Sequence, residues 1–450
     1  MSKKKDNPAR IGFGKFMAWQ SRGVSLAANF LVLSYLSIYL SDTMHMDIKL
    51  VGTLLLVSKI FDGVTDLFAG YLVDNTNTRW GKARPYEICI LGVWLCTWLL
   101  FSVPESASTL VKSIWVFLLY TLTNSVFATL LNANGNPYML RAFKTQEQYV
   151  RLSAFGGIVV MLVSIAVSVA LPLTITAIAT SPAGWKRLVL MYAAPMAIIG
   201  IMRFLFVKED VSVDAKVNEK VKLSEMLLVL KKNKYIYIAL GVTFLFQFIN
   251  GMNVGSYYFT WIIGDLSVFS IFGGLSVMVL PVMLFFPMLS RKFSVGQLMA
   301  GGGILGAIGG LIGFFAGTNL PMLLFAAVLT AIATLAPSYM MSIMLLDCGT
   351  YNELNGMARM DGTVCAVNNF ASKLGSGIGS GLMGIILGAA GYVGSQSVQP
   401  DSAILAIRAI YGLVPFISYL TVALLTFRYR LNKTNEELRA RQAEALTEEA

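Results

Sequence analysis

The chain has 450 residues, of which 56% are hydrophobic and only 13% are charged, and its mean hydropathy is +0.68. Soluble globular proteins carry about 25% charged residues, so these values exclude an ordinary soluble domain, and they also exclude disorder, collagen and coiled coil. The net charge of +11 comes from 35 basic and 24 acidic residues. Because the basic residues gather at the ends of apolar runs, we interpret the excess as a signal of membrane topology and expect no nucleic-acid partner.

Apolar runs separated by polar breaks predict an all-α polytopic membrane protein with twelve transmembrane helices. Glycines scattered through these runs suit close helix packing and favour a helical bundle over a β-barrel. The predicted spans lie near residues 12–41, 48–74, 85–104, 111–139, 150–179, 187–207, 235–263, 268–290, 295–316, 321–346, 362–390 and 404–428.

The longest polar stretch follows the sixth predicted span and divides the spans into two sets of six. Every second loop is basic, which places both termini in the cytoplasm and the chain in a plasma membrane, of the bacterial cytoplasmic type. Two six-helix bundles joined by a linker are typical of the major facilitator fold, whose solute site lies between the bundles. The predicted organisation is a cytoplasmic tail (1–11), a six-helix bundle (12–207), a cytoplasmic linker (208–234), a second six-helix bundle (235–428) and a cytoplasmic tail (429–450).

Two carboxylates in the middle of the second span are the strongest chemical signal. Asp62 and Asp66 are one helical turn apart, with Lys59 a turn earlier and Thr65 between them. An ionised Asp at the centre of a membrane helix costs about 2.5–3.5 kcal/mol, so such residues persist when they are paired or functional. Two like charges at this spacing predict a bound Na⁺ or a shared proton. The alternative is a salt bridge from Lys59 to one carboxylate with no part in transport.

A charged cytoplasmic turn, residues 70–86, follows this span. Asp74, Arg79, Lys82 and Arg84 lie in it, and Pro85 is suited to start the next helix. Such a turn is a candidate gate that breaks and re-forms during transport. The alternative is a fixed turn that carries only the positive charge of an inner loop.

The same residues give the chain its resemblance to a known family. It resembles the glycoside-pentoside-hexuronide:cation symporters, the melibiose permease relatives in the major facilitator superfamily. Supporting matches are Arg151 at the start of the fifth span, Tyr351 after the tenth, and Lys373 in the eleventh. The matching run comprises Asp62, Thr65-Asp66, Gly70, Asp74, Thr78-Arg79-Trp80-Gly81-Lys82 and Arg84-Pro85-Tyr86.

The resemblance implies cation-coupled uptake of a glycoside-like solute. It implies that Asp62 and Asp66 are cation ligands, with Thr65 and Thr129 helping, and that Lys373 links the cation site to the opposite bundle. It implies no cofactor beyond the coupling ion, Na⁺ or H⁺. Lys59, Arg151 and the charged residues of the cytoplasmic turn would couple or gate the movement.

The first span departs from the family pattern, because members that carry neutral sugars have an Asp there and this chain has Arg22. A guanidinium is suited to bind a carboxylate, a sulfonate or a phosphate. We therefore expect an anionic solute such as a hexuronide, unless Arg22 pairs with Asp62 or Asp66 and the solute is neutral. Further solute-binding candidates are Trp19, Gln20, Asn132, Asn250 and Lys373.

Two other functions remain open. One is a major facilitator carrier of another small organic or amphipathic compound, such as a neutral sugar or a lipid-like or sterol-like conjugate. The other is a membrane-embedded enzyme or receptor, which the sequence disfavours because its single histidine, His45, lies in a short outer loop and no glycine-rich run forms a phosphate-binding loop. We expect a monomeric transporter with a small-molecule substrate, surrounded by membrane lipid, and no enzymatic activity.

Overall fold

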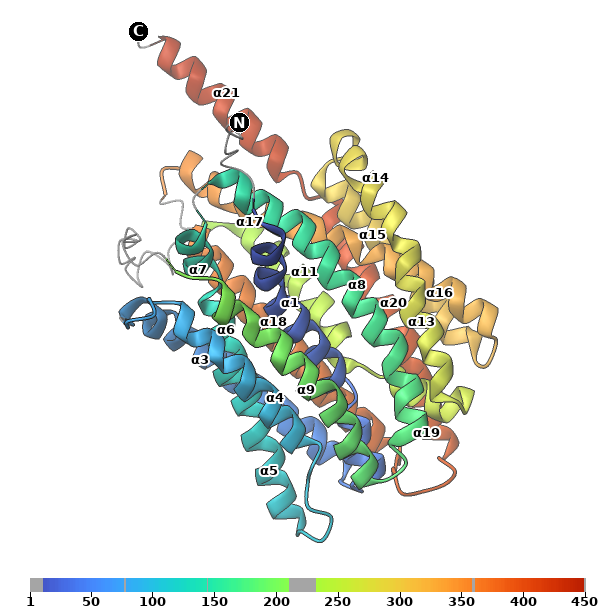
Figure 1. Cartoon of the computed structure of the whole chain (residues 1–450). Coiled ribbons are helices and arrows are strands. Elements are labelled where there is room, and N and C mark those ends of the chain that lie inside the picture. Colours follow the sequence, from blue (N-terminus) through green and yellow to red (C-terminus); the bar gives the residue numbers. More distant parts are fainter. Residues whose placement is uncertain (1–10, 77, 144, 210–231, 358–360, 449–450) are drawn as a thin grey trace, which may run out of the picture. The chain divides into compact units, whose positions relative to one another are not determined.

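The computed structural model describes residues 11–76, 78–143, 145–209, 232–357 and 361–448 (Figure 1). Within these ranges the regular structure is helical, apart from one isolated bridge between Thr78 and Gly81. Nine of the described helices are long and apolar enough to cross a membrane. The predicted all-helical polytopic fold is confirmed.

The other three predicted spans, near 48–74, 85–104 and 268–290, also lie on helices. The first coincides with α3 (Ile48–Asn75), which carries five charged residues. The second coincides with the short 3₁₀ segment η2 (Arg84–Ile88) and α4 (Cys89–Leu100). The third is divided between α13 (Phe269–Leu275) and α14 (Val279–Lys292), which are joined by η6 (Ser276–Met278).

The chain divides into two compact units. The first comprises Met1–Val217, Asp265–Gly274 and Tyr392–Val398, and the second comprises Asn218–Gly264, Leu275–Gly391 and Gln399–Ala450. Each unit is described by itself below.

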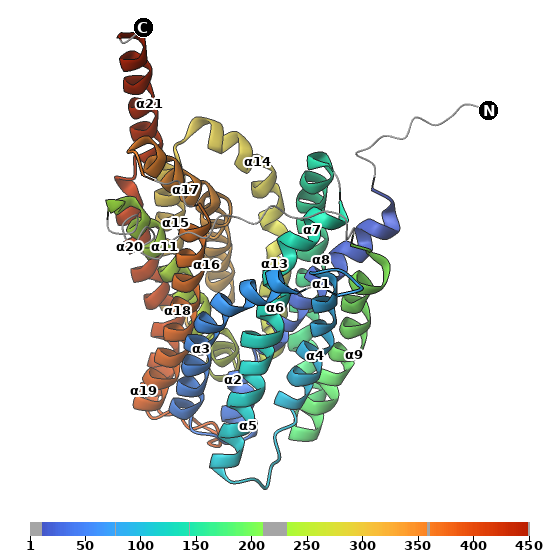
Figure 2. The same cartoon turned by 90° about the vertical axis from the view of Figure 1, so that its left-hand side faces the viewer.

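In the first unit, α1 lies against α8 and α9, and α4 packs on α9 (Figure 1). On another side of this unit, α3 lies beside α5, η3 and α6 (Figure 2). Besides α3, η2 and α4, its elements are α1 (Phe13–Leu33), α2 (Leu36–Ile38), η1 (Tyr39–Thr43), α5 (Thr109–Thr121), η3 (Leu122–Ala128), α6 (Thr129–Ala133), α7 (Gly135–Ala142), α8 (Gln146–Ile178), α9 (Pro182–Phe206) and η5 (Leu266–Val268).

The second unit is built around the pairs of α11 with α18, and of α15 with α16 and α20. Besides α14 and η6, its elements are α11 (Lys234–Met252), α12 (Gly255–Tyr258), η4 (Phe259–Ile263), α15 (Val295–Ala316), α16 (Leu320–Ala333), α17 (Leu335–Leu354), α18 (Asp361–Ala389), α19 (Asp401–Arg408), η7 (Ala409–Leu413), α20 (Val414–Phe427) and α21 (Leu431–Glu448).

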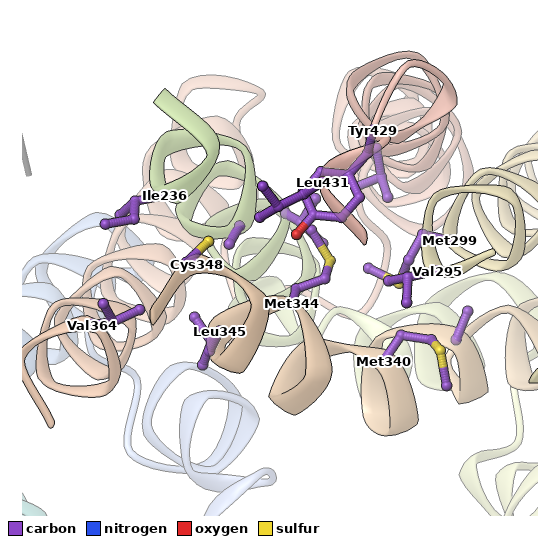
Figure 3. Packing of buried hydrophobic residues seen from close by; sticks show 14 of the residues in the cluster. Ile236, Val295, Met299, Met340, Met344, Leu345, Cys348, Val364, Tyr429 and Leu431 are labelled. Carbon is purple, nitrogen blue, oxygen red and sulfur yellow. The ribbon is translucent and has the colours of Figure 1, made fainter. Parts of the chain in front are cut away.

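The core of the second unit gathers apolar side chains from α11, α15, α17 and the segment around α20 (Figure 3). Met344 and Cys348 of α17 are fully buried there, beside Tyr429 and Leu431. Burial of this apolar surface and close helix packing hold the unit together.

The pair α11 and α18 approaches too closely for side chains at the crossing. A Cβ atom at Gly375 would overlap the carbonyl oxygen of Phe244, and one at Gly379 would overlap that of Phe248. Glycine on one helix therefore lets the other backbone come into direct contact. Lys373 lies on α18 next to this contact, so it is carried by a tightly joined helix pair.

Candidate functional site

The two intramembrane carboxylates lie on α3, which begins at Ile48 because Asp47 accepts hydrogen bonds from the amides of Lys49 and Leu50. Asp62 is buried, with 4% of its surface exposed, and Asp66 is half-buried. Their spacing of four residues directs both side chains toward the same neighbouring helix. That neighbour is α6, which packs against α3 within the first unit (Figure 2).

Thr129, the first residue of α6, brings the two carboxylates together. Its hydroxyl oxygen lies 3.0 Å from Asp62 Oδ1 and 3.1 Å from Asp66 Oδ1. The carbonyl oxygen of Asn124 lies 3.1 Å from the same hydroxyl. A hydroxyl has one proton and can donate to only one of these acceptors at a time. The Thr129 hydroxyl therefore lies among three oxygen acceptors, two of which belong to carboxylates.

Lys59 places a positive charge beside this cluster. Lys59 Nζ lies 4.0 Å from Asp62 Oδ2 and 5.7 Å from the centre of the Tyr120 ring. A proton or a hard cation held by the carboxylate oxygens would lower the repulsion between Asp62 and Asp66.

A π-helical segment places Thr129 at the cluster. The seven residues of η3, Leu122–Ala128, lie between α5 and α6 in the fourth predicted span. A π-turn spans one residue more than an α-turn and is common at functional sites. Thr129 follows this segment directly, and a hydrogen bond of 2.9 Å between Ser58 and Thr121 joins α3 to α5 before it.

Thr65, the other predicted helper, is directed elsewhere. Its hydroxyl donates to the backbone carbonyl of Asp62 at 3.0 Å, a bond within α3. Between the two threonines, the structure therefore gives Thr129 the direct contact with both carboxylates.

Arg22 has an acidic partner that the sequence analysis did not consider. Its Nη1 donates to Glu87 Oε1 at 2.9 Å, to the carbonyl of Leu131 at 2.7 Å and to Asn134 Oδ1 at 2.6 Å. The alternative pairing of Arg22 with Asp62 or Asp66 is wrong, because Glu87 takes that place. Glu87 lies at the start of the third predicted span, where a buried carboxylate could have been noted as a candidate partner.

A second arginine joins this pair. Arg203 Nε lies 3.7 Å from the same Glu87 oxygen, and Arg203 Cζ lies 3.2 Å from the centre of the Trp19 ring. Trp19 is buried and also packs against Tyr138 and Phe143. This predicted solute contact therefore lies within the packing of the first unit, as a support for Arg203.

The remaining predicted solute contacts are spread over both units. Gln20 is buried and donates to the carbonyl of Leu152 at 3.0 Å. Asn132 is exposed on α6. Asn250 on α11 is exposed and Lys373 on α18 is half-buried, both in the second unit.

The charged turn after α3, predicted to be cytoplasmic, is held by contacts with α9. Arg84 Nε donates to the carbonyl of Phe204 at 2.9 Å, and the Arg79 guanidinium lies 5.0 Å from the Trp80 ring. The backbone amide of Lys82 donates to Glu209, a residue that the sequence analysis placed in the linker. Arg151 is exposed. The side chain of Asp74 lies outside the part that the structure describes.

The match to a family model extends over most of the chain. The model described as MFS/sugar transport protein matches residues 24–433. The isoprimeverose transporter of Lactiplantibacillus pentosus is 28% identical, over 96% of this chain and 93% of that protein. In Escherichia coli (strain K12), a glucuronide carrier protein homolog is 25% identical over 85% of this chain and 84% of its own length, and a putative glycoside/cation symporter is 24% identical over 96% and 94%.

Solved structures share the fold. A bacterial homologue of the human lysosomal transporter Spinster, in an inward-facing and unoccupied conformation, aligns with a TM-score of 0.65 at 12% identity, over 95% of this chain and 99% of that one. This likeness supports the fold alone. With the family match, it follows that the chain belongs to the MFS/sugar transport protein family and is a multi-pass membrane transporter of the major facilitator superfamily, not an enzyme.

Proposed function

We propose that this protein is a symporter that uses a Na⁺ or H⁺ gradient to take up a glycoside by alternating access. The observation that carries the proposal is the convergence of Asp62, Asp66 and Thr129, because two carboxylates around one hydroxyl form a site for a single positive charge. The putative glycoside/cation symporter among the relatives supports the same activity.

Coupling follows from the charge at this site. While the site is empty, the two carboxylates repel each other within a buried environment, and a bound cation or proton relieves that repulsion. If the relaxed arrangement binds solute more tightly, solute must raise cation affinity by the same factor. The carrier would then cross between its outward-open and inward-open states with both sites filled or both empty.

We propose further that the solute is anionic, for example a hexuronide. Arg22 and Arg203 both lie within 4 Å of one carboxylate, that of Glu87, so this group carries one excess positive charge. The Glu87 side chain is fully buried, whereas 12% of the Arg22 side chain is exposed, so the accessible charge is positive. The glucuronide carrier homolog among the relatives is consistent with this choice.

The basic inner loops support a place in the cytoplasmic membrane of a bacterial cell, with both termini in the cytoplasm. Lys373, on the second unit, would connect solute binding to the cation site. These two assignments rest on the charge pattern and on the family resemblance.

The experiment is uptake into proteoliposomes of two labelled solutes that differ by one carboxylate, methyl β-glucuronide and methyl β-glucoside. We expect accumulation of the glucuronide under an inward Na⁺ or H⁺ gradient, little uptake of the glucoside, and no response to the gradient in Asp66→Asn. If neither gradient changes uptake by the unaltered protein, symport is excluded. Preferred uptake of the glucoside would exclude the anionic solute and favour a neutral sugar.

A further inference from the structure

Glu209 contacts the cytoplasmic turn that precedes η2 in the first unit. It follows α9 by three residues, and its side chain is 1% exposed. Its Oε1 accepts from the amide of Lys82 at 3.1 Å, and its Oε2 accepts from the amides of Ala83 and Arg84 at 3.0 Å each. Arg141 Nη1, from α7, donates to Oε1 at 3.0 Å.

This carboxylate caps the start of a helix, although it comes from a distant part of the chain. The amides that it binds are at the start of η2, where backbone donors lack partners within the helix. Such donors are usually satisfied by a nearby Ser, Thr, Asp or Asn. Here the preceding residue is Ala83, and the acceptor comes from 125 residues further along the chain.

Gly81 makes room for this contact. Its φ is +110°, a conformation that side chains rarely adopt, and a Cβ atom there would overlap Glu209 Oε2. The position of the Glu209 carboxylate therefore explains why residue 81 of the turn motif is a glycine.

The contact closes a buried charge network. Arg141 and Glu209 are both buried, so water cannot readily replace either partner. Loss of the carboxylate would leave a guanidinium and three backbone amides without this acceptor, and breaking one side of a buried pair is strongly unfavourable.

We propose that Glu209 is a positioning residue for transport: its carboxylate clasps the Gly81–Arg84 turn to the end of α9 and to α7, so that these parts move as one piece. This inference rests on the proposed transport function for its kinetic consequence. The clasp itself can be tested without any solute.

The first readout is hydrogen exchange of the amides of residues 82–84 in the purified full-length protein. Glu209→Gln keeps the size of the side chain but removes its charge and replaces one of its two acceptor oxygens with a donor NH2 group. We expect these amides to exchange at least about tenfold faster in this variant, while the exposed Glu436→Gln leaves them unchanged. Unchanged protection in Glu209→Gln overturns the proposal.

The second readout is transport in proteoliposomes. In Glu209→Gln, the maximal rate should fall about tenfold with a half-saturating solute concentration within about twofold of the unaltered protein, because the solute site is untouched. Gly81→Ala should do the same by displacing the carboxylate. Its control is Gly157→Ala, where an added Cβ meets nothing within 4 Å. A normal maximal rate despite fast exchange would also overturn the proposal.

Glu209→Asp provides a milder variant if the glutamine variant does not reach the membrane. It keeps the charge but withdraws the carboxylate by one methylene, and both readouts should lie between those of Glu209→Gln and the unaltered protein. If the unaltered protein accumulates no solute under either gradient, the proposed function fails, whereas hydrogen exchange still decides whether Glu209 forms the clasp.

Discussion

Replacement of Thr129 by alanine should strengthen cation binding, because it removes the hydroxyl that donates a hydrogen bond to the empty carboxylates of Asp62 and Asp66. The two oxygen-to-oxygen distances, 3.0 and 3.1 Å, are nearly equal, so the one proton serves both acids in turn. Asp62 is 4% exposed, and water is a poor replacement at such a position.

The size of the effect follows from the charge of the acceptors. A hydrogen bond to a charged group contributes about 1.5–3 kcal/mol. Because this hydrogen bond stabilises the ionised carboxylates of the empty site, and about 1.4 kcal/mol corresponds to a tenfold change in an equilibrium constant, its loss should raise cation affinity by about 10-fold to about 150-fold.

The assay is the cation concentration that gives half-maximal solute uptake, measured separately for Na⁺ and for H⁺. Thr129→Ser keeps the hydroxyl and should stay within about threefold of the unaltered protein. Thr65→Ala is the matched control, since that hydroxyl binds only a backbone carbonyl among the contacts described. An alanine at 129 that leaves both half-saturating concentrations unchanged, or a larger effect at 65 than at 129, would refute the assignment.

Three other changes have expected outcomes. Lys59→Gln removes a positive charge 4.0 Å from Asp62. Since the attraction in such a pair is worth at least about 1 kcal/mol, the half-saturating cation concentration should fall about fivefold. A rise in that concentration would show instead that Lys59 helps the cation to bind. Glu87→Gln leaves the buried Arg203 and the half-buried Arg22 without their acid and should cost about 3–5 kcal/mol of stability, which thermal unfolding measures; an unchanged midpoint would contradict it. Gly379→Ala should separate α11 from α18 and lower the unfolding temperature, whereas Gly301→Ala, whose Cβ meets nothing, should not.

The sequence predicted well what depends on local spacing. Hydropathy located the spans, and the separation of Asp62 from Asp66 predicted a shared helix face, which agrees with the convergence of their oxygens on Thr129. Charges in mid-membrane stand out in any sequence because they are costly there.

Partners from distant segments could not be predicted in this way. Thr129 is 67 residues from Asp62, and only the family resemblance suggested it. In the sequence, Glu209 is one of several charges in a polar linker. Its role depends on hydrogen bonds from three amides that lie 125 to 127 positions earlier. Arg22 was expected to bind an anionic solute or to pair with Asp62 or Asp66, but its pairing with Glu87 depends on how α1 packs beside α4.

The π-helical segment before Thr129 gives this helix a surplus residue at its middle. Successive residues of a helix are rotated by about 100° about its axis. If the π-helical segment moved by one residue toward α6, the Thr129 hydroxyl would rotate away from α3 while both ends of the helix stayed wound. Only a few backbone hydrogen bonds in η3 would be exchanged. Such a shift would open or close the oxygen cluster from within the fourth span, without any movement of whole helices.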